Sequence, residues 1–399
     1  MAEKIDSKIP KIRFKGFEDG WLEDQLGERV EFFSGLTYSP RNVQKGVGTL
    51  VLRSSNVKNG EIVNADNVYV DPKCVNSKYV EVGDIAVVVR NGSRSLIGKH
   101  AQIKNRMDNT VIGAFMTGIH SEFPAFTNAL LDTPQFDKEI AKNLGATINQ
   151  ITTGAFRQMM FRFPRRTEQT KIGGYFRELD LLIGLHKRKH DKLVTLKQAM
   201  LQKLFPQPGA TTPEIRFKGF SGEWGEIEFK QIASRSTQAT SEENLPRIEY
   251  EDIISGTGRL NKDIFKKPSR KVGIKFERSD VLFGKLRPYL RNWWLAEFGG
   301  IAVGDFWVLK PAAATSNLIY CLIQTAAFER IANQSAGSKM PRSDWNLVSN
   351  SLLRIPINIE EQQIIGHYFR TLDELISKHA TQLQKLQQLK FACLEKMFV

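Results

Sequence analysis

Two groups of arginine, lysine, amide and hydroxyl side chains have the chemistry needed to bind a nucleic acid. Basic side chains bind phosphates and guanine, and amides can pair with adenine. One group follows an expected strand in each half of the chain, and a second precedes each expected long helix. The candidate DNA contacts of the first half are Arg90, Asn91, Ser93, Arg94, Thr147, Gln150 and Arg157. Those of the second half are Lys285, Arg287, Tyr289, Arg291, Asn292, Lys339 and Arg342. Each residue could equally be an ordinary solvated surface group.

Net charge supports the interpretation of these residues as binding groups. The chain carries a formal charge of +14 and has a pI near 9.6. Neutralising phosphates supplies the sequence-independent part of DNA affinity, so a polyanionic partner is expected. The alternative is a protein that is basic without binding a polyanion.

The search for catalytic chemistry gives a different result. The sequence contains no glycine-rich nucleotide fingerprint, no Walker loop, no His-Glu-x-x-His and no Asn/Asp-Pro-Pro-Tyr/Phe tetrapeptide. Two carboxylate-x-lysine triplets, Asp71-Pro-Lys73 and Glu228-Phe-Lys230, resemble part of a nuclease metal site. The aligned positions of the opposite half lack the acid, and such triplets are common by chance. We therefore predict no catalytic residue, no metal site and no cofactor bound by this chain.

Composition indicates a cytoplasmic protein of two domains. A chain of 399 residues exceeds one ordinary core, and 41% apolar with 25% charged residues is typical of globular proteins. Three widely spaced cysteines favour a reducing compartment. The charged N-terminus does not resemble a signal peptide, and no apolar run is long enough to span a bilayer.

The elements that must position the candidate residues occur twice. Residues 168–205 align with 361–398, and 20 of these 38 positions are identical. A shorter segment, Ile-Arg-Phe-Lys-Gly-Phe followed by Trp, opens each half at residues 12–21 and 215–224. The material between the repeats differs in length. This arrangement indicates two different recognition surfaces on one pseudo-two-fold frame.

Each half begins with a mixed α/β region. Residues 49–53 and 84–90 are expected to form strands, and one helix is expected from Ala125 to about Lys142. The linker at residues 205–213 contains three prolines and a glycine, which cannot continue a helix. The predicted segments are 1–165, 166–206, 207–357 and 358–399. The first and third are α/β domains, and the second and fourth are single long helices.

The long helices carry apolar residues alternately three and four positions apart, as in a coiled coil. An antiparallel pairing of the two helices, with a length of about 50 Å, is expected at about 1.5 Å per residue. The alternative is a pair of ordinary amphipathic surface helices. The expected seam in the first helix is Ile172, Tyr175, Leu179, Leu182, His186, Leu193, Leu196 and Met200. In the second it is Ile365, Tyr368, Leu372, Leu375, His379, Leu386, Leu389 and Cys393.

Four sets of residues together resemble one family, the specificity subunits of type I restriction–modification systems. They are the opening segment of each half, the stretch Gly284-Lys-Leu-Arg-Pro-Tyr-Leu290, the Phe-Pro or Ile-Pro approach to each long helix, and Phe-Arg-x-Leu-Asp at 176–180 and 369–373. The resemblance covers the whole chain. The first half departs from it, because residues 88–94 replace the Lys-Leu-Arg-Pro-Tyr stretch.

The resemblance implies an α+β fold in which two target recognition domains are separated by an antiparallel coiled coil. It also implies a non-catalytic subunit that reads a bipartite, asymmetric site in double-stranded DNA. Two methyltransferase subunits would supply S-adenosylmethionine and modify an adenine in each half-site. Restriction subunits using ATP and Mg²⁺ would cut unmodified DNA. The main alternative is a stand-alone sequence-specific DNA-binding protein without methyltransferase partners.

Overall fold

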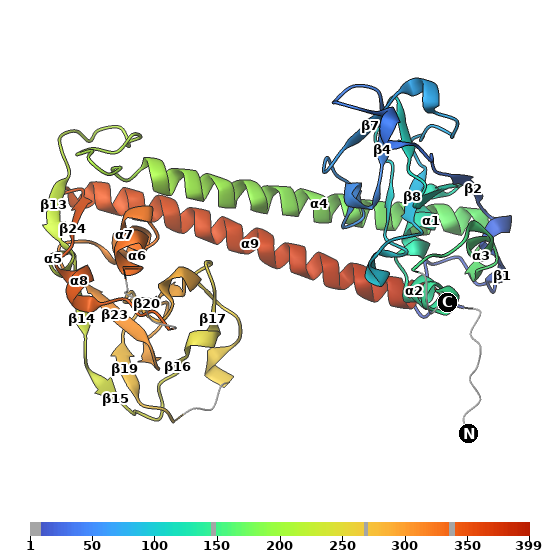
Figure 1. Ribbon diagram of the computed structural model, residues 1–399. Coiled ribbons are helices and arrows are strands. Elements are labelled where there is room, and N and C mark those ends of the chain that lie inside the picture. The colour runs from blue at the N-terminus through green and yellow to red at the C-terminus, as the bar shows by residue number, and fades with distance from the viewer. Residues whose placement is uncertain (1–8, 145–148, 267–269, 335–339) are drawn as a thin grey trace. The chain divides into compact units, whose positions relative to one another are not determined.

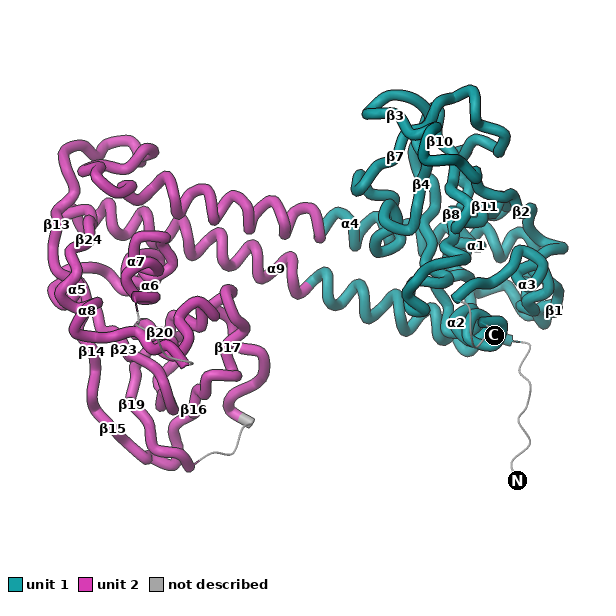
Figure 2. The backbone as a smooth tube through the Cα atoms, viewed as in Figure 1, with its two compact units in different colours: residues 1–186, 382–399 teal, residues 187–381 magenta. Residues whose placement is uncertain are grey.

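The chain forms two compact units. The structure, a computed structural model, describes residues 9–144, 149–266, 270–334 and 340–399. Unit 1 comprises Met1–His186 and Gln382–Val399, and unit 2 comprises Lys187–Thr381 (Figure 2). Two long helices, α4 (Arg166–Lys203) and α9 (Ile359–Met397), each contribute to both units (Figure 1). The mixed α+β class and the two long helices are therefore confirmed, whereas the four-segment division stays a prediction.

Unit 1 contains two four-stranded sheets, ordered β10-β4-β7-β3 and β2-β11-β8-β9, and the strand pairs β1-β12 and β5-β6. Strands β10 and β4 run parallel, and the other pairs are antiparallel. Its strands are β1 (Leu22–Gln25), β2 (Glu31–Ser34), β3 (Val43–Gln44), β4 (Thr49–Leu52), β5 (Val57–Lys58), β6 (Glu61–Ile62), β7 (Val68–Val70), β8 (Ile85–Val88), β9 (His100–Gln102), β10 (Thr110–Ile112), β11 (Met116–His120) and β12 (Met160–Phe163). Its short α-helices are α1 (Pro124–Leu131), α2 (Pro134–Asn143) and α3 (Thr153–Arg157).

Unit 2 repeats this plan with sheets β14-β23-β20-β21 and β15-β19-β22-β16 and the pairs β13-β24 and β17-β18. Here β16 and β22 are the parallel neighbours. Its strands are β13 (Gly225–Glu228), β14 (Ala233–Ser236), β15 (Ala239–Thr240), β16 (Arg247–Ile248), β17 (Ile253–Ile254), β18 (Arg259–Leu260), β19 (Gly273–Phe276), β20 (Val281–Gly284), β21 (Trp293–Leu295), β22 (Gly300–Ala302), β23 (Phe306–Pro311) and β24 (Leu352–Ile355). Its short α-helices are α5 (Phe229–Ile232), α6 (Ser316–Leu322), α7 (Ala326–Ala332) and α8 (Trp345–Ser349).

The single helix expected from Ala125 to Lys142 is wrong, because the segment forms two helices, α1 and α2. Thr133 caps α2 by accepting a hydrogen bond from the Phe136 amide, and Pro134 has no amide hydrogen to continue α1. Thr325 caps α7 in the same way in unit 2, where no proline follows. The capping threonine is therefore the shared signal that separates the two helices.

In each unit, the beginning of one long helix packs against the end of the other. In unit 1, Phe398 of the chain end packs against Trp21 and Phe176, with ring centroids 5.9 Å apart in both pairs. In unit 2, Phe205 occupies the equivalent place against Trp224 at 5.8 Å and Phe369 at 6.3 Å. The repeated aromatic residues therefore fasten each α/β region to both helices.

A buried ion pair reinforces this attachment in both units. Arg13 donates from Nε and Nη2 to the two carboxylate oxygens of Glu168, both at 2.8 Å. Arg216 pairs with Glu361 in the same geometry at 2.7 and 2.8 Å. Both glutamates are 1% exposed or less, so each arginine supplies the hydrogen bonds that the carboxylate loses on leaving water.

In each unit, a lysine in the C-terminal half of one long helix joins three elements. In unit 1, Lys390 Nζ lies 2.7 Å from Asp132 and 2.8 Å from Asp180. In unit 2, Lys197 lies 2.7 Å from Asp373 and donates to the Gln324 side chain at 2.7 Å. Unit 1 therefore has two carboxylates where unit 2 has one carboxylate and a neutral amide.

We expect this cluster to make unit 1 sensitive to acid. Burial opposes ionisation of Asp132, but His100 and Lys390 outweigh it and lower the pKa of Asp132 to about 2, from an ordinary value of 3.8. Because the folded pKa is lower, the stabilisation is present above about pH 4 and is lost as pH falls towards 2. Chemical denaturation at several pH values should show a loss of up to about 2 kcal/mol. Asp132→Asn should reduce this pH dependence, and an unchanged dependence would contradict the assignment.

Adjacent glycines in α4 give a matched test of close packing. A Cβ on Gly173 would lie 2.6 Å from the Phe126 amide nitrogen, whereas a Cβ on Gly174 would meet nothing within 4 Å. Gly173→Ala should therefore destabilise unit 1 by about 1–3 kcal/mol. Gly174→Ala should stabilise it by about 0.5–1 kcal/mol, since alanine favours helix interiors. Denaturant unfolding of both variants checks the pair, and equal effects would refute the close contact.

The expected seam residues differ in burial. The buried members are Ile172, Leu179, Ile365, Leu372 and Cys393. The half-buried members are Tyr175, His186, Leu193, Met200, Tyr368, His379 and Leu386. The exposed members are Leu182, Leu196, Leu375 and Leu389, at 38–46% exposure. The exposed leucines are two pairs of equivalent repeat positions, so each unit presents one from each helix.

Candidate nucleic-acid interface

In unit 1, the structure brings the two predicted groups of contact residues together. The Ile151 amide donates to the Val89 carbonyl at 2.9 Å, and the Asn91 amide donates to the Asn149 carbonyl at 3.2 Å. Arg90 and Gln150 consequently face each other in an isolated β-bridge. The segment after β8 and the segment before α3, separated by some sixty residues of sequence, form one paired loop.

The side chains of this paired loop are largely exposed. The Arg90 guanidinium lies over the Phe115 ring at 5.0 Å, and Arg157 lies over Phe32 at 5.6 Å. Such stacking orients a guanidinium and leaves its N–H groups available. Arg94 and Gln150 are also exposed. Among the residues that the structure describes, no carboxylate pairs with Arg90, Arg94 or Arg157. Thr147 lies outside the described residues.

Asn91 and Ser93 form hydrogen bonds that hold the loop in place. The side-chain nitrogen of Asn91 donates to Ser54 Oγ at 3.0 Å, and its side-chain oxygen accepts from the Ser93 backbone amide at 3.0 Å. Ser93 Oγ lies 2.9 Å from Ser95 Oγ. These bonds fix the turn that carries Arg94.

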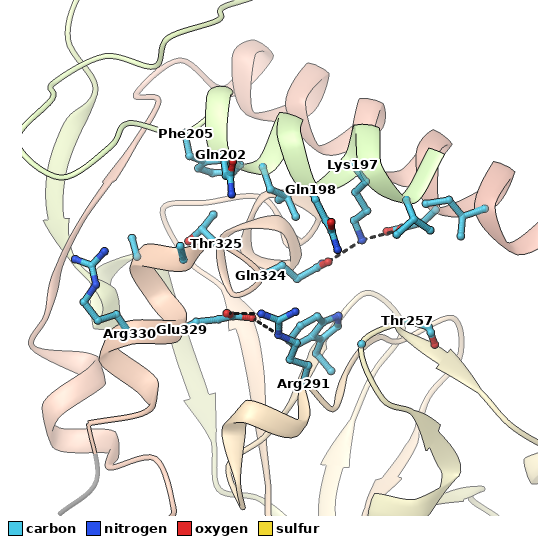
Figure 3. Close-up of a pocket in the computed structure, with 18 of the residues that line it drawn as sticks. Lys197, Gln198, Gln202, Phe205, Thr257, Arg291, Gln324, Thr325, Glu329 and Arg330 are labelled. Carbon is cyan, nitrogen blue, oxygen red and sulfur yellow. Dashed lines mark hydrogen bonds and ion pairs between the residues drawn. The ribbon is translucent and has the colours of Figure 1, made fainter. Parts of the chain in front are cut away.

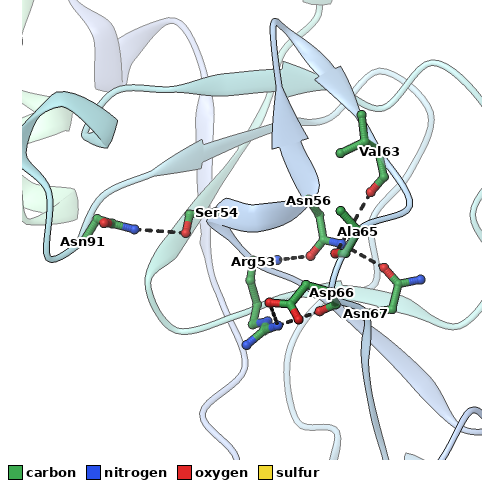
Figure 4. A network of polar contacts seen from close by, with 8 residues as sticks. All are labelled: Arg53, Ser54, Asn56, Val63, Ala65, Asp66, Asn67 and Asn91. Carbon is green, nitrogen blue, oxygen red and sulfur yellow. Dashed lines mark hydrogen bonds and ion pairs between the residues drawn. The ribbon is translucent and has the colours of Figure 1, made fainter. Parts of the chain in front are cut away.

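Sequence reasoning missed a polar network beside Asn91 (Figure 4). Asn56 is fully buried, accepts from the Arg53 amide and donates to the Ala65 carbonyl and to Asn67. It thereby holds the turn on which Ser54 lies. The run Ser54-Ser55-Asn56 was the only available signal, and it has no distinctive spacing.

Unit 2 builds the same paired loop from different side chains. The Ser343 amide donates to the Lys285 carbonyl at 2.9 Å, and the Arg287 amide donates to the Pro341 carbonyl at 2.7 Å. Leu286 and Arg342 form the bridge that Arg90 and Gln150 form in unit 1. Arg342 therefore occupies the place of Gln150. Lys339 lies outside the described residues.

An acid lies beside the basic side chains of this second loop. Asp305 accepts from Nε and Nη2 of Arg342 at 3.2 and 3.1 Å, and Lys285 Nζ lies 3.7 Å away. The hydrogen bond to Asp305 raises the pKa of Arg342 above its ordinary value. Tyr289, which follows Lys285 by four positions in the sequence, is 57% exposed. The sequence offered no reason to select Asp305, because its partners lie 20 and 37 residues away.

Arg287 and Arg291 adopt left-handed backbone conformations, with φ of 47° and 57°. Non-glycine residues rarely adopt this conformation, and it is concentrated at functional sites. They flank the short 3₁₀ turn Pro288–Leu290, which carries Tyr289. The turn is also held by hydrogen bonds from Tyr250 to the Leu286 carbonyl and from Ser255 to the Leu290 carbonyl.

Two predicted contacts of unit 2 interact with other parts of the unit. Arg291 forms a double ion pair with Glu329 at 2.8 and 2.9 Å and lines a cavity of about 560 Å³ (Figure 3). Asn292 is 7% exposed and donates to the Tyr250 carbonyl at 3.4 Å. The structure therefore groups Lys285 with Arg342 but sets Arg291 and Asn292 apart from them.

The two carboxylate-x-lysine triplets have structural roles. Asp71 caps a 3₁₀ turn by accepting from the Lys73 amide at 2.9 Å. Glu228 precedes α5 and pairs with Lys230 at 2.9 Å. Within the described ranges, no group of three or more His, Cys, Asp or Glu side chains is arranged to hold a metal ion. Likewise, no helix in the described part of the chain is both long and apolar enough to cross a membrane.

The chain thus consists of two α/β units, each with a paired loop and each joined to both long helices. A crystal structure of the type I restriction–modification S subunit from M. genitalium has this fold, with a TM-score of 0.69 and 16% identity over 98% of this chain and 99% of that one. The curated proteins that this chain resembles are type I specificity subunits as well. This chain is 25% identical over 174 residues to the EcoKI specificity subunit of Escherichia coli K12 and 24% identical to the StySPI specificity subunit of Salmonella potsdam.

The resemblance to type I specificity subunits is thereby confirmed. Each curated match covers 42% of this chain and 37% of the relative, so the shared segment is well under half of either protein. No protein-family model matches the chain.

Proposed function

We propose that this chain is the non-catalytic DNA-recognition subunit of a type I restriction–modification complex. Each unit reads one half of a bipartite, asymmetric site through its paired loop. The observation that carries the proposal is the recurrence of that loop with different side chains, Arg90 and Gln150 in one unit and Leu286 and Arg342 in the other. The same backbone frame with different hydrogen-bonding groups reads different bases.

The two long helices serve as the spacer between the readers. Contacts in each unit join the start of one helix to the end of the other, as an antiparallel coiled coil requires. Tyr175 Oη lies 3.4 Å from Cys393 Sγ in unit 1, and Lys197 Nζ lies 2.7 Å from Asp373 Oδ1 in unit 2. Because one chain supplies both readers, the DNA site need not be palindromic.

The repeated surface of the helices provides places for two copies of a partner. Each unit exposes one leucine of each helix, Leu182 with Leu389 in unit 1 and Leu375 with Leu196 in unit 2. A surface that occurs once in each unit can bind one copy of the same partner in each. The partners are two methyltransferase subunits, which bind S-adenosylmethionine, joined by restriction subunits that use ATP and Mg²⁺. This chain supplies none of those sites.

Methylome sequencing tests this function. A methylation-free host would express the chain with its neighbouring methyltransferase, and each protein alone. N6-methyladenine in one bipartite motif with a fixed gap, only on co-expression, is the expected result. An active methyltransferase that gives no such motif would overturn the proposal. Specific DNA binding by the chain alone would then favour a stand-alone DNA-binding protein.

A further inference from the structure

The loop of unit 2 contains an arginine whose orientation is fixed by a carboxylate. Arg342 is bound along its Nε–Nη2 edge by both oxygens of Asp305. This side-on geometry leaves both N–H groups of Nη1 and one N–H of Nη2 unused by Asp305. Two parallel N–H groups on one edge match N7 and O6 of guanine in the major groove.

A residue that reads a base must be more exposed than the group that orients it, and Arg342 and Asp305 meet this condition. The Arg342 side chain is 52% exposed, whereas that of Asp305 is 27% exposed. The carboxylate is therefore more covered than the guanidinium that it holds. Lys285 is a second cation beside the same carboxylate, with its Nζ 3.7 Å from Oδ1. The group of three side chains keeps a net charge of +1 and remains attractive to DNA.

The backbone around this group is also fixed. The Lys285 amide donates to the Asp305 carbonyl at 2.8 Å, and the Ser343 amide donates to the Lys285 carbonyl at 2.9 Å. Three segments that are distant in sequence therefore hold Arg342, Asp305 and Lys285 in one arrangement. A side chain ordered before binding loses less conformational entropy when it contacts a base.

Unit 1 has no such arginine–aspartate pair at the equivalent positions. Gln150 occupies the place of Arg342. Phe115 occupies the place of Asp305, because its carbonyl accepts from the Val89 amide as the Asp305 carbonyl accepts from the Lys285 amide. Glutamine is suited to adenine rather than guanine, and phenylalanine has no carboxylate to orient it. The two paired loops therefore share a backbone arrangement but differ in the base that they prefer.

We infer that Asp305 is a positioning residue that directs Arg342 to one guanine in the half-site read by unit 2. The inference rests on the proposed function. It adds that the base is a guanine, that Arg342 reads it, and that Asp305 orients Arg342. Asp305 acts through Arg342 and does not itself contact the base.

The test is methylome sequencing with Asp305→Ala and Arg342→Gln in the complex with the methyltransferase. Both variants should relax the same guanine position of one half-site, with at least about a tenfold fall in preference. The other half-site should stay unchanged. A merely structural role would instead reduce methylation uniformly across the motif. Unchanged base preference, or relaxation at two different positions, would overturn the inference.

Two further variants complete the design. Glu226→Gln breaks a comparable surface pair with Arg354, 3.2 Å long, on the β13-β24 ladder, and it should leave the motif unchanged. If the unit 2 variants fail to fold, the same Arg–Asp pair can be built in unit 1 by combining Phe115→Asp with Gln150→Arg. That variant should create a guanine requirement in the other half-site, and failure to do so would overturn the inference. A wild-type complex without any bipartite motif would instead refute the proposed function itself.

Discussion

Lys390→Met is expected to destabilise unit 1 by about 3–5 kcal/mol, because removing one member of a half-buried ion cluster leaves Asp180 without its lysine and Asp132 with His100 alone. The lysine lies between Asp132 and Asp180, and all three side chains are less than 30% exposed. Both carboxylates would lose their shared counter-ion. The same change at Lys197 leaves one carboxylate and a neutral glutamine, so the loss in unit 2 should be smaller, about 1–3 kcal/mol.

Native-state hydrogen exchange can assign each loss to its unit, because it reports local opening free energies. Lys385→Met, an exposed position on the same helix as Lys390, is the matched control and should stay within about 0.5 kcal/mol of the wild type. If Lys390→Met and Lys385→Met had equal effects, the ion cluster would contribute nothing. If Lys197→Met cost more than Lys390→Met, the number of carboxylates would not determine the loss.

The frame of the molecule was largely predictable because it is repeated. Two copies of a segment that share residues such as Tyr175/Tyr368 and Asp180/Asp373 must have the same environment in both places. The structure gives them equivalent contacts, down to the buried pairs of Glu168 and Glu361. The break between α1 and α2 was missed because Thr133 caps a helix only when the preceding turn ends there, which helical periodicity does not reveal.

The candidate site was predictable in part. Local sequence identified Arg90, Gln150, Lys285 and Arg342 as candidates, because their side chains have the required hydrogen bonds. It could not show that Arg291 pairs with Glu329, since that ion pair connects residues 38 apart. Asp305 was missed for the same reason. Long-range ion pairs decide which carboxylate holds each arginine, and they depend on the fold.

The second large effect is expected from the paired loop of unit 1. Replacing Arg90, Arg94, Gln150 and Arg157 together with alanine should weaken binding to a duplex carrying the recognised motif by about 100-fold or more. Individual base contacts each contribute about 1–3 kcal/mol, and well-separated contacts are roughly additive. Each arginine that binds a phosphate should also reduce the slope of log affinity against log salt by about 1.

Fluorescence anisotropy with the chain in complex with its methyltransferase can measure this loss at several salt concentrations. The matched control removes three other exposed cations of unit 1, Lys15, Lys45 and Lys138, and so makes the same change in net charge. Discrimination provides the more selective readout. The loop variant should bind a duplex with a scrambled first half-site as well as the intact motif, yet should still reject a scrambled second half-site. An equal loss in the control, or retained discrimination at the first half-site, would show that the paired loop does not read DNA.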